Sequence, residues 1–142
     1  MKDLAGKVAL ITGAASGIGR GMAEAFAAHD MKVVAADVNA EGLGELTSAA
    51  MISTLDVRDR KAWADLVARA ERDLGPVQLV CNNAGVTAYP EPLLDQREEA
   101  WDWVMGGNTG GPYAGSVTVA RRLRELGLPG HIVNTSSIQG VF

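Results

Sequence analysis

A glycine-rich segment between an apolar run and a helical pattern is the feature that most constrains the fold. Residues 8–11 are a short, continuous apolar run, which is typical of a strand buried on both faces. Residues 12–19 follow with the spacing Thr-Gly-x-x-x-Gly-x-Gly and lead directly into a helix. A strand, a glycine-rich turn and a helix in this order are the setting that a phosphate-binding turn requires.

Each glycine of this segment has an expected task. Gly13 lets the chain turn sharply, Gly17 lets the backbone approach a pyrophosphate, and Gly19 lets the helix pack close to the strand. The helix N-terminus offers free N–H groups and a partial positive charge. A tight connection without a ligand is the alternative. The residues expected to hold the phosphates are Gly13, Ala15, Ser16, Gly17, Ile18 and Gly19.

Strands and helices are expected to alternate along the rest of the chain. Further apolar runs lie at residues 31–36, 52–55, 77–81 and 131–135. Helical patterns between them call for an α/β fold with a parallel sheet and helices on both faces. Right-handed crossovers make a doubly wound sheet the expected arrangement. We expect residues 1–142 to form a single domain.

The helices carry start and stop signals. A short helix is expected at residues 40–50, a second from the N-cap Asp59 to Gly75, and a long one from Glu98 to residue 126. Four glycines and a proline crowd the middle of the long helix, so we expect a kink near Asn108. The first helix is expected to bury a face formed by Ile18, Met22, Ala25, Phe26 and His29.

Asp37 comes directly after the second strand, 18 residues beyond Gly19. A carboxylate there can accept hydrogen bonds from both ribose hydroxyls of an adenosine and repels a 2′-phosphate. No Lys or Arg stands at Ser16 or Val38 to bind such a phosphate. The pattern therefore favours NAD over NADP as the cofactor. A turn residue that caps the next helix is the alternative.

Polar or small residues also follow the other strands. Asp56 and Val57 end the third strand and could bond an adenine, the former through its carboxylate and the latter through its backbone. The fourth strand ends in a segment whose small residues allow backbone to lie along a cofactor, and ordinary strand-end turns remain the alternative for both. These further cofactor-binding candidates are Asn83, Ala84 and Gly85, with Thr135 at the end of the fifth strand.

Composition excludes several classes of function. A net charge of −4 gives no electrostatic footprint for nucleic acid or an anionic membrane. No apolar run approaches the length of a membrane span, and the first residues lack the features of a signal peptide. The one cysteine, Cys81, cannot form an internal disulfide. We therefore expect a cytoplasmic protein that contacts neither membrane nor nucleic acid.

Taken together, these motifs resemble the short-chain dehydrogenase/reductase family. The resemblance covers the whole chain and implies a Rossmann-type fold and hydride exchange between NAD and a small-molecule alcohol or ketone. It also implies a homo-oligomer, a dimer or tetramer, in the full-length form, and no metal. The residues that carry it, in order, are Thr12 to Gly19, Asp37, Asp56-Val57, Asn82 to Gly85, Asn108 and Ser137 to Gly140.

The resemblance also implies catalytic roles. Asn108 matches the family's Asn, which kinks a helix and anchors a water in a proton relay. Ser137 matches the Ser whose hydroxyl bonds the substrate oxygen, and its neighbour Ser136 is the less favoured choice. A Tyr and a Lys four residues apart are expected a dozen residues after Ser137, whereas the sequence ends at Phe142. We therefore expect the fold to be truncated after the fifth strand and this chain alone to be inactive.

Two other classes of function stay open at this point. A non-catalytic nucleotide-binding or scaffold protein would need no Tyr-Lys pair. Another Rossmann-like enzyme, such as a methyltransferase, could use Asp37 for an adenosine ribose. The segments at residues 82–85 and 137–140 argue against the methyltransferase.

Overall fold

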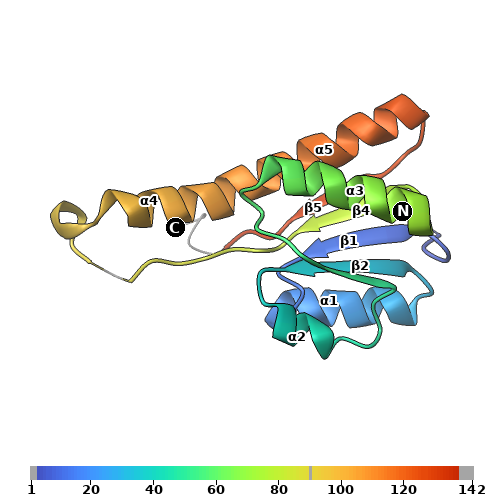
Figure 1. Cartoon of the computed structure of the whole chain (residues 1–142), viewed down its shortest axis with the longest axis horizontal. Coiled ribbons are helices and arrows are strands. Elements are labelled where there is room, and N and C mark those ends of the chain that lie inside the picture. The colour runs from blue at the N-terminus through green and yellow to red at the C-terminus, as the bar shows by residue number, and fades with distance from the viewer. Residues whose placement is uncertain (1–2, 90, 138–142) are drawn as a thin grey trace.

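The computed structural model describes residues 3–89 and 91–137, which form a single parallel sheet with helices on both faces (Figure 1). The strands lie in the order β3-β2-β1-β4-β5, and every neighbouring pair is parallel. The chain builds outward from β1 in both directions, so the predicted doubly wound sheet is confirmed. The strands are β1 Val8–Thr12, β2 Lys32–Asp37, β3 Met51–Thr54, β4 Val77–Asn82 and β5 His131–Asn134.

Two helices cover each face of the sheet. The helices α1 Gly17–Ala28 and α2 Ala40–Gly44 pack on one face, and α3 Arg60–Leu74 and α5 Gly111–Leu126 pack on the other. A 3-10 turn, η1 Leu93–Asp95, precedes α4 Glu98–Met105. Figure 1 shows α4 extending in line with α5, beyond the ends of the strands.

Most predicted element boundaries agree with the structure within two residues. The exception is α2, which was expected to reach residue 50 and ends at Gly44. Its N-cap is Asn39, whose side chain accepts a hydrogen bond from the Gly42 N–H. Gly42 and Gly44 both disfavour helix, and turns replace it over the following residues.

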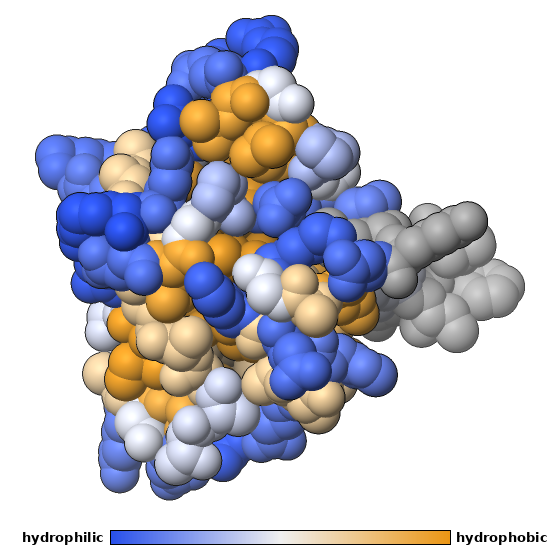
Figure 2. Space-filling view, turned by 90° about the vertical axis from the view of Figure 1, so that its right-hand side faces the viewer, coloured by the Kyte–Doolittle hydropathy of each residue, from blue (hydrophilic) through white to orange (hydrophobic). Residues whose placement is uncertain are grey.

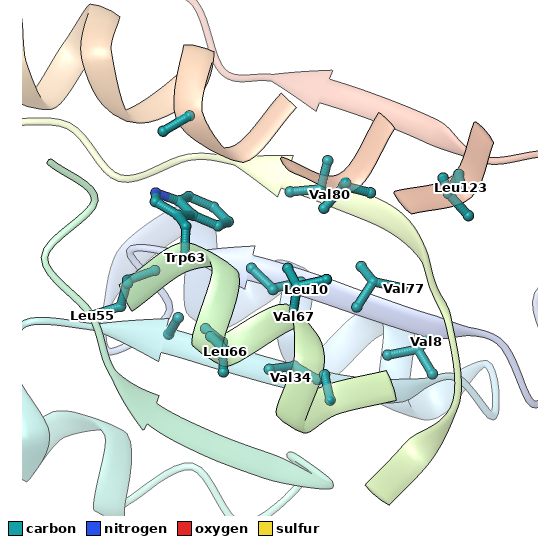
Figure 3. Packing of buried hydrophobic residues seen from close by; sticks show 14 residues of the cluster. Val8, Leu10, Val34, Leu55, Trp63, Leu66, Val67, Val77, Val80 and Leu123 are labelled. Carbon is teal, nitrogen blue, oxygen red and sulfur yellow. The ribbon is translucent and has the colours of Figure 1, made fainter. Parts of the chain in front are cut away.

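Trp63 lies fully buried in the core between the sheet, α3 and α5 (Figure 3). Its indole Nε1 donates to the Val57 carbonyl at 3.0 Å, so the polar atom of this large side chain is satisfied. The bond also ties the connection between β3 and α3 to the core. The predicted inner face of α3 is confirmed, since its buried residues are Trp63, Leu66, Val67 and Ala70.

The helix α1 contacts the opposite face of the sheet through small residues, because Gly19 and Ala23 are its buried positions. The predicted inner face is therefore wrong in part. Ile18 is 68% exposed, Ala25 is exposed, and His29 lies beyond the last helical residue as the C-cap. Gly19 makes the close contact instead, since a Cβ atom there would collide with the Gly13 carbonyl. The buried Cys81 also lies in this core, and burial raises its thiol pKa to about 11.

The predicted kink in the long helix is a single π-helical turn, η2 Gly106–Gly110, which joins α4 to α5. Asn108 stands in the middle of this turn. Gly127, with φ of 66°, then ends α5 in the left-handed conformation that glycine adopts without strain. The glycines near Asn108 thus widen the helix without breaking it.

The strand β5 forms one edge of the sheet and pairs only with β4 among the described strands. All four of its residues are exposed, including Ile132 and Val133. None of the described helices is long and apolar enough to cross a membrane. Figure 2 shows the end of the molecule where the strands begin, and hydrophobic residues gather there in patches that hydrophilic residues border.

Gly115 allows α5 to approach the core closely. A Cβ atom there would lie 2.6 Å from Cη2 of Trp63 and would also meet Oδ1 of Asn82. We expect Gly115→Ala to lower the free energy of unfolding by about 2 kcal/mol, because overpacking outweighs the gain of about 1 kcal/mol in helix propensity. Urea unfolding monitored by circular dichroism measures the change.

Gly21→Ala is the matched control, since a Cβ at this position in α1 has no atom within 4 Å. This variant should raise the free energy of unfolding by about 0.5–1 kcal/mol. Equal urea midpoints for the two variants would contradict the packing argument.

Candidate functional site

The predicted cofactor-binding residues converge at the carboxyl ends of the strands, where ligands bind in open α/β sheets. A cavity of about 460 Å³ lies there. All the predicted residues line it except Ala15 and Gly19. Sequence reasoning missed further lining residues, namely Val38, Leu55, Arg58, Val86, Trp103 and Gly107.

The glycine-rich turn has the backbone conformation that was predicted. Gly13 and Gly17 have φ of 67° and 52°, in the left-handed region that L side chains rarely adopt. A Cβ on Gly13 would lie 3.0 Å from Cα of Ala84, so the turn also touches the segment after β4. A Cβ on Gly19 would collide with the Gly13 carbonyl. Gly19 therefore packs α1 against the turn, and the cavity lies at the N-terminus of this helix.

Asp37 connects the glycine-rich turn to the end of β2. Its Oδ2 accepts a hydrogen bond from the Ala15 N–H at 3.0 Å, and its Oδ1 accepts one from the Asn39 N–H at 2.9 Å. The carboxylate thus lies at the cavity wall with one turn on each side. The cap of α2 is Asn39, so the alternative that Asp37 caps this helix is wrong.

Thr12 organises the segment that follows β4. Its buried hydroxyl oxygen accepts hydrogen bonds from the N–H groups of Asn83 and Ala84, at 3.0 and 3.1 Å. The hydroxyl itself donates to the Cys81 carbonyl at 3.3 Å. The sequence analysis includes Thr12 only as the first residue of the glycine motif. The signal for its role in this network is a hydroxyl residue at the end of a buried strand.

The side chains of Asn82 and Asn83 extend this network toward β5. Asn83 donates from Nδ2 to the Thr12 carbonyl at 3.1 Å and accepts from the Thr135 hydroxyl at 3.0 Å. Asn82 donates from Nδ2 to Oδ1 of Asn134 at 2.8 Å and to the Ser116 hydroxyl oxygen at 3.0 Å. The two amides therefore join the carboxyl ends of β1, β4 and β5.

Asn108 forms a two-point hydrogen bond with one residue of the cavity wall. Its Nδ2 donates to the Val86 carbonyl and its Oδ1 accepts from the Val86 N–H, both at 2.8 Å. Asn108 is exposed, as an ordinary solvated helix residue would be, but its side chain is committed to these two hydrogen bonds. Asn108 does not line the cavity itself but holds the segment after β4 against η2.

Ser137 is exposed and lies two residues beyond Thr135, which lines the cavity. It is the last residue that the structure describes, so residues 138–140 of the predicted motif lie outside the described residues. Within the described ranges, no three or more His, Cys, Asp or Glu side chains form a group that could hold a metal ion.

Asp56 lies at the cavity wall in an ion pair with Arg58, whose Nη2 is 2.6 Å from Oδ2. The guanidinium hydrogen bonds keep the pKa of Asp56 below its ordinary value, and the carboxylate is charged at neutral pH. Arg58 was not predicted, because its position in the sequence carries no motif.

A larger groove of about 800 Å³ runs between α3 and α5. None of the predicted site residues lines it, and its two carboxylates, Glu71 and Glu125, both form ion pairs with Arg122, at 2.7 and 2.9 Å. The smaller cavity at the strand ends is therefore the candidate site.

Known proteins resemble the chain over nearly its whole length. Residues 7–142 match the family model for short chain dehydrogenase. The C alpha-dehydrogenase of Sphingobium sp. (strain NBRC 103272 / SYK-6) is 38% identical over 99% of this chain and 48% of its own length. The NADP-dependent (R)-specific alcohol dehydrogenase of Lentilactobacillus kefiri is 34% identical over 96% and 56% of the two chains.

A solved structure is similar in fold as well. The short chain dehydrogenase/reductase from Burkholderia phymatum in complex with NAD has a TM-score of 0.94 and 36% identity, over 100% of this chain and 53% of its own. The chain spans about half the length of these relatives.

The Thr12 hydroxyl yields a direct test of how the site is held. Thr12→Val keeps the shape of the side chain but leaves the N–H groups of Asn83 and Ala84 without their acceptor. We expect the free energy of unfolding to fall by about 1–3 kcal/mol. Thr12→Ser retains the hydroxyl and should lose clearly less. Thermal and urea unfolding of both variants measure the difference, and equal losses would show that the hydroxyl is not the cause.

Proposed function

Because the chain belongs to the short chain dehydrogenase family, we propose that it is the dinucleotide-binding part of an NAD-dependent oxidoreductase acting on an alcohol or ketone. The observation that carries the proposal is the convergence of the glycine-rich turn, Asp37, Asp56 and residues 83–85 on one cavity. Family membership argues against a methyltransferase. We also propose that residues 1–142 belong to one domain, because the two hydrophobic cores of the described residues lie on opposite faces of the same sheet.

The residues of the cavity fit a dinucleotide. Gly13 and Gly17 present bare backbone at two positions of the turn, and no atom lies within 4 Å of a Cβ position on Gly17. The first N–H groups of α1 lack partners within the helix and carry its partial positive charge, so they suit a pyrophosphate. Asp37 would accept hydrogen bonds from ribose hydroxyls, and Asp56 would accept one from an adenine amino group.

The charges at the cavity favour NAD over NADP. Its charged lining residues, within the described part of the chain, are Asp37, Asp56 and Arg58. The one cation among them is already paired with Asp56. A 2′-phosphate would thus meet the Asp37 carboxylate with no uncommitted cation among these residues. The relatives include an NADP-dependent enzyme and a structure in complex with NAD. The choice of NAD over NADP therefore rests on this charge pattern.

Ser137 and Asn108 have different proposed roles in the reaction. When bound, the nicotinamide gives or takes the hydride. In the reduction of a ketone, the hydride goes to the carbonyl carbon and a proton goes to the oxygen. The Ser137 hydroxyl would donate a hydrogen bond to this oxygen and stabilise its developing charge. Asn108 positions the cavity wall through Val86, and the anchoring of a relay water remains a proposal.

The proton-transfer group is assigned to a part of the protein outside this chain. Tyr89 is 89% exposed, and Tyr113 lies in the groove between α3 and α5. Neither tyrosine lines the cavity. Since the relatives are about twice as long, a Tyr-Lys pair in the remainder of the whole protein fits this proposal. The chain alone would then bind NAD without turnover, as a non-catalytic nucleotide-binding protein also would.

We also propose a homo-oligomer in the cytoplasm. Large apolar side chains are exposed on and before α4, which supports self-association of the whole protein. A single buried cysteine suits a reducing compartment. The exposed apolar residues are Tyr89, Leu93, Leu94, Trp101, Trp103 and Met105.

Asp37 provides the test of cofactor choice. We expect the chain to bind NADH at least about tenfold more tightly than NADPH, since an unpaired charge near the phosphate costs more than 1.4 kcal/mol. Asp37→Asn should bring the two affinities within about threefold of each other while keeping a side-chain oxygen for the Ala15 N–H. Calorimetric titrations at one salt concentration measure both. Tighter NADPH binding by the unaltered chain would contradict the proposal.

Ser137 provides the test of catalysis in the whole protein. Ser137→Ala should lower kcat by about 10²–10³-fold and change the affinity for NADH by less than about twofold, because the hydroxyl acts on the developing charge. Ser136→Ala is the matched control and should leave kcat nearly unchanged. NADH absorbance with a panel of secondary alcohols and ketones measures the rates. A larger loss in the Ser136 variant would reverse the assignment.

A further inference from the structure

Arg58 holds the Asp56 carboxylate at the cavity wall through three of its N–H groups. The backbone N–H donates to Oδ1 at 3.0 Å, Nε donates to Oδ1 and Oδ2 at 3.0 and 3.1 Å, and Nη2 donates to Oδ2 at 2.6 Å. Such a fork fixes the orientation of a carboxylate as well as its charge. A single residue, Arg58, therefore fixes the orientation of the Asp56 carboxylate.

The end of α4 closes over the same guanidinium group. The Cζ of Arg58 lies 4.5 Å from the centre of the Trp103 ring, which is a cation–π contact. The stem of Arg58 also packs on Gly106, where a Cβ atom would lie 3.0 Å from Cδ. Trp103 lines the cavity beside Asp56 and Arg58. These contacts hold Arg58 in place although 42% of its side chain is exposed.

The hydrogen bonds from Arg58 leave little acceptor capacity on Asp56. A carboxylate has about four lone-pair positions, and three N–H donors of Arg58 occupy most of them. The remaining capacity suits a single N–H donor from a ligand in the cavity. An amino group on a purine matches this acceptor, whereas a carbonyl oxygen at the same position would face a fixed negative charge.

We propose that Arg58, backed by Trp103, is a positioning residue that fixes Asp56 as the acceptor for the 6-amino group of adenine. The site thereby selects an adenine dinucleotide over its hypoxanthine counterpart. Arg58 acts through Asp56 and needs no contact with the base. This inference rests on the proposed function, because it places the adenine end of NAD at Asp56.

The test compares NADH with its reduced hypoxanthine analogue, in which a carbonyl oxygen replaces the 6-amino group. Calorimetric titration of the unaltered chain should give about tenfold tighter binding of NADH, the value of one charge-assisted hydrogen bond. In Arg58→Ala the ratio should fall to about twofold or less. Arg58→Lys should lose the ratio as well, because Lys keeps the charge but lacks the planar fork.

Two glycines at the ends of η2 supply a second pair of variants. Gly106→Ala places a methyl group against Cδ of Arg58 and should lower the ratio without changing any charge. Gly110→Ala is its control, since the atom nearest to its Cβ position is the Met105 carbonyl at 3.7 Å. The Gly110 variant should keep the ratio of the unaltered chain. This pair decides the question if the Arg58 variants fail to fold.

The outcomes separate this inference from the proposed function. If the unaltered chain does not bind NADH, the proposed function fails and the inference falls with it. If NADH binds and its ratio to the analogue is the same in the Arg58→Ala and Arg58→Lys variants as in the unaltered chain, the inference alone is overturned. A ratio that survives in Arg58→Lys but not in Arg58→Ala assigns the effect to charge and overturns the positioning role.

Discussion

The hydroxyl of Thr12 is the contact on which the arrangement of the cavity depends. In a doubly wound sheet the chain leaves β1 first toward β2 and later returns to place β4 on its other side. The carboxyl ends of β1 and β4 are therefore not consecutive in the chain, and noncovalent contacts have to hold them together. Thr12 does this by accepting two N–H groups from the turn after β4, 71 and 72 residues away in the sequence. The Thr12 side chain that makes this contact is itself buried.

Side-chain amides extend this hydrogen-bond network outward from the centre of the sheet. Asn83 links Thr12 to Thr135 through its side-chain amide, and Asn108 binds the backbone N–H and carbonyl of Val86. The walls of the cavity are consequently fixed by side chains that lie far apart in the sequence. Loops at this edge would otherwise move independently. In the glycine-rich turn, by contrast, the wall presents backbone without side chains at Gly13 and Gly17.

The fold and most of the cavity could be predicted because their signals are local. Buried apolar runs mark the strands, glycine spacing marks the turn, and Asp37 stands at a fixed distance from it. The burial of α1 was predicted wrongly at Ile18, since periodicity counts apolar residues and cannot register that Gly19 makes the close contact. Arg58 escaped prediction for a related reason. Its importance depends on Trp103, 45 positions later, and that proximity exists only after the long helix has folded over the β3–α3 connection.

The π-helical turn has a consequence for how such a chain tolerates insertions and deletions. A π turn holds one more residue than an α-helical turn, so α4 and α5 are out of phase by one position. Deleting one residue within 106–110 would let this turn close as a regular α-helical turn and would leave α4 and α5 in nearly the same relative orientation. A residue added within the regular helix of α4 or α5 would instead turn the two ends against each other by about 100°. The π turn is thus the place where this long helix can lose a residue without moving Trp103 away from Arg58 or α5 away from Trp63.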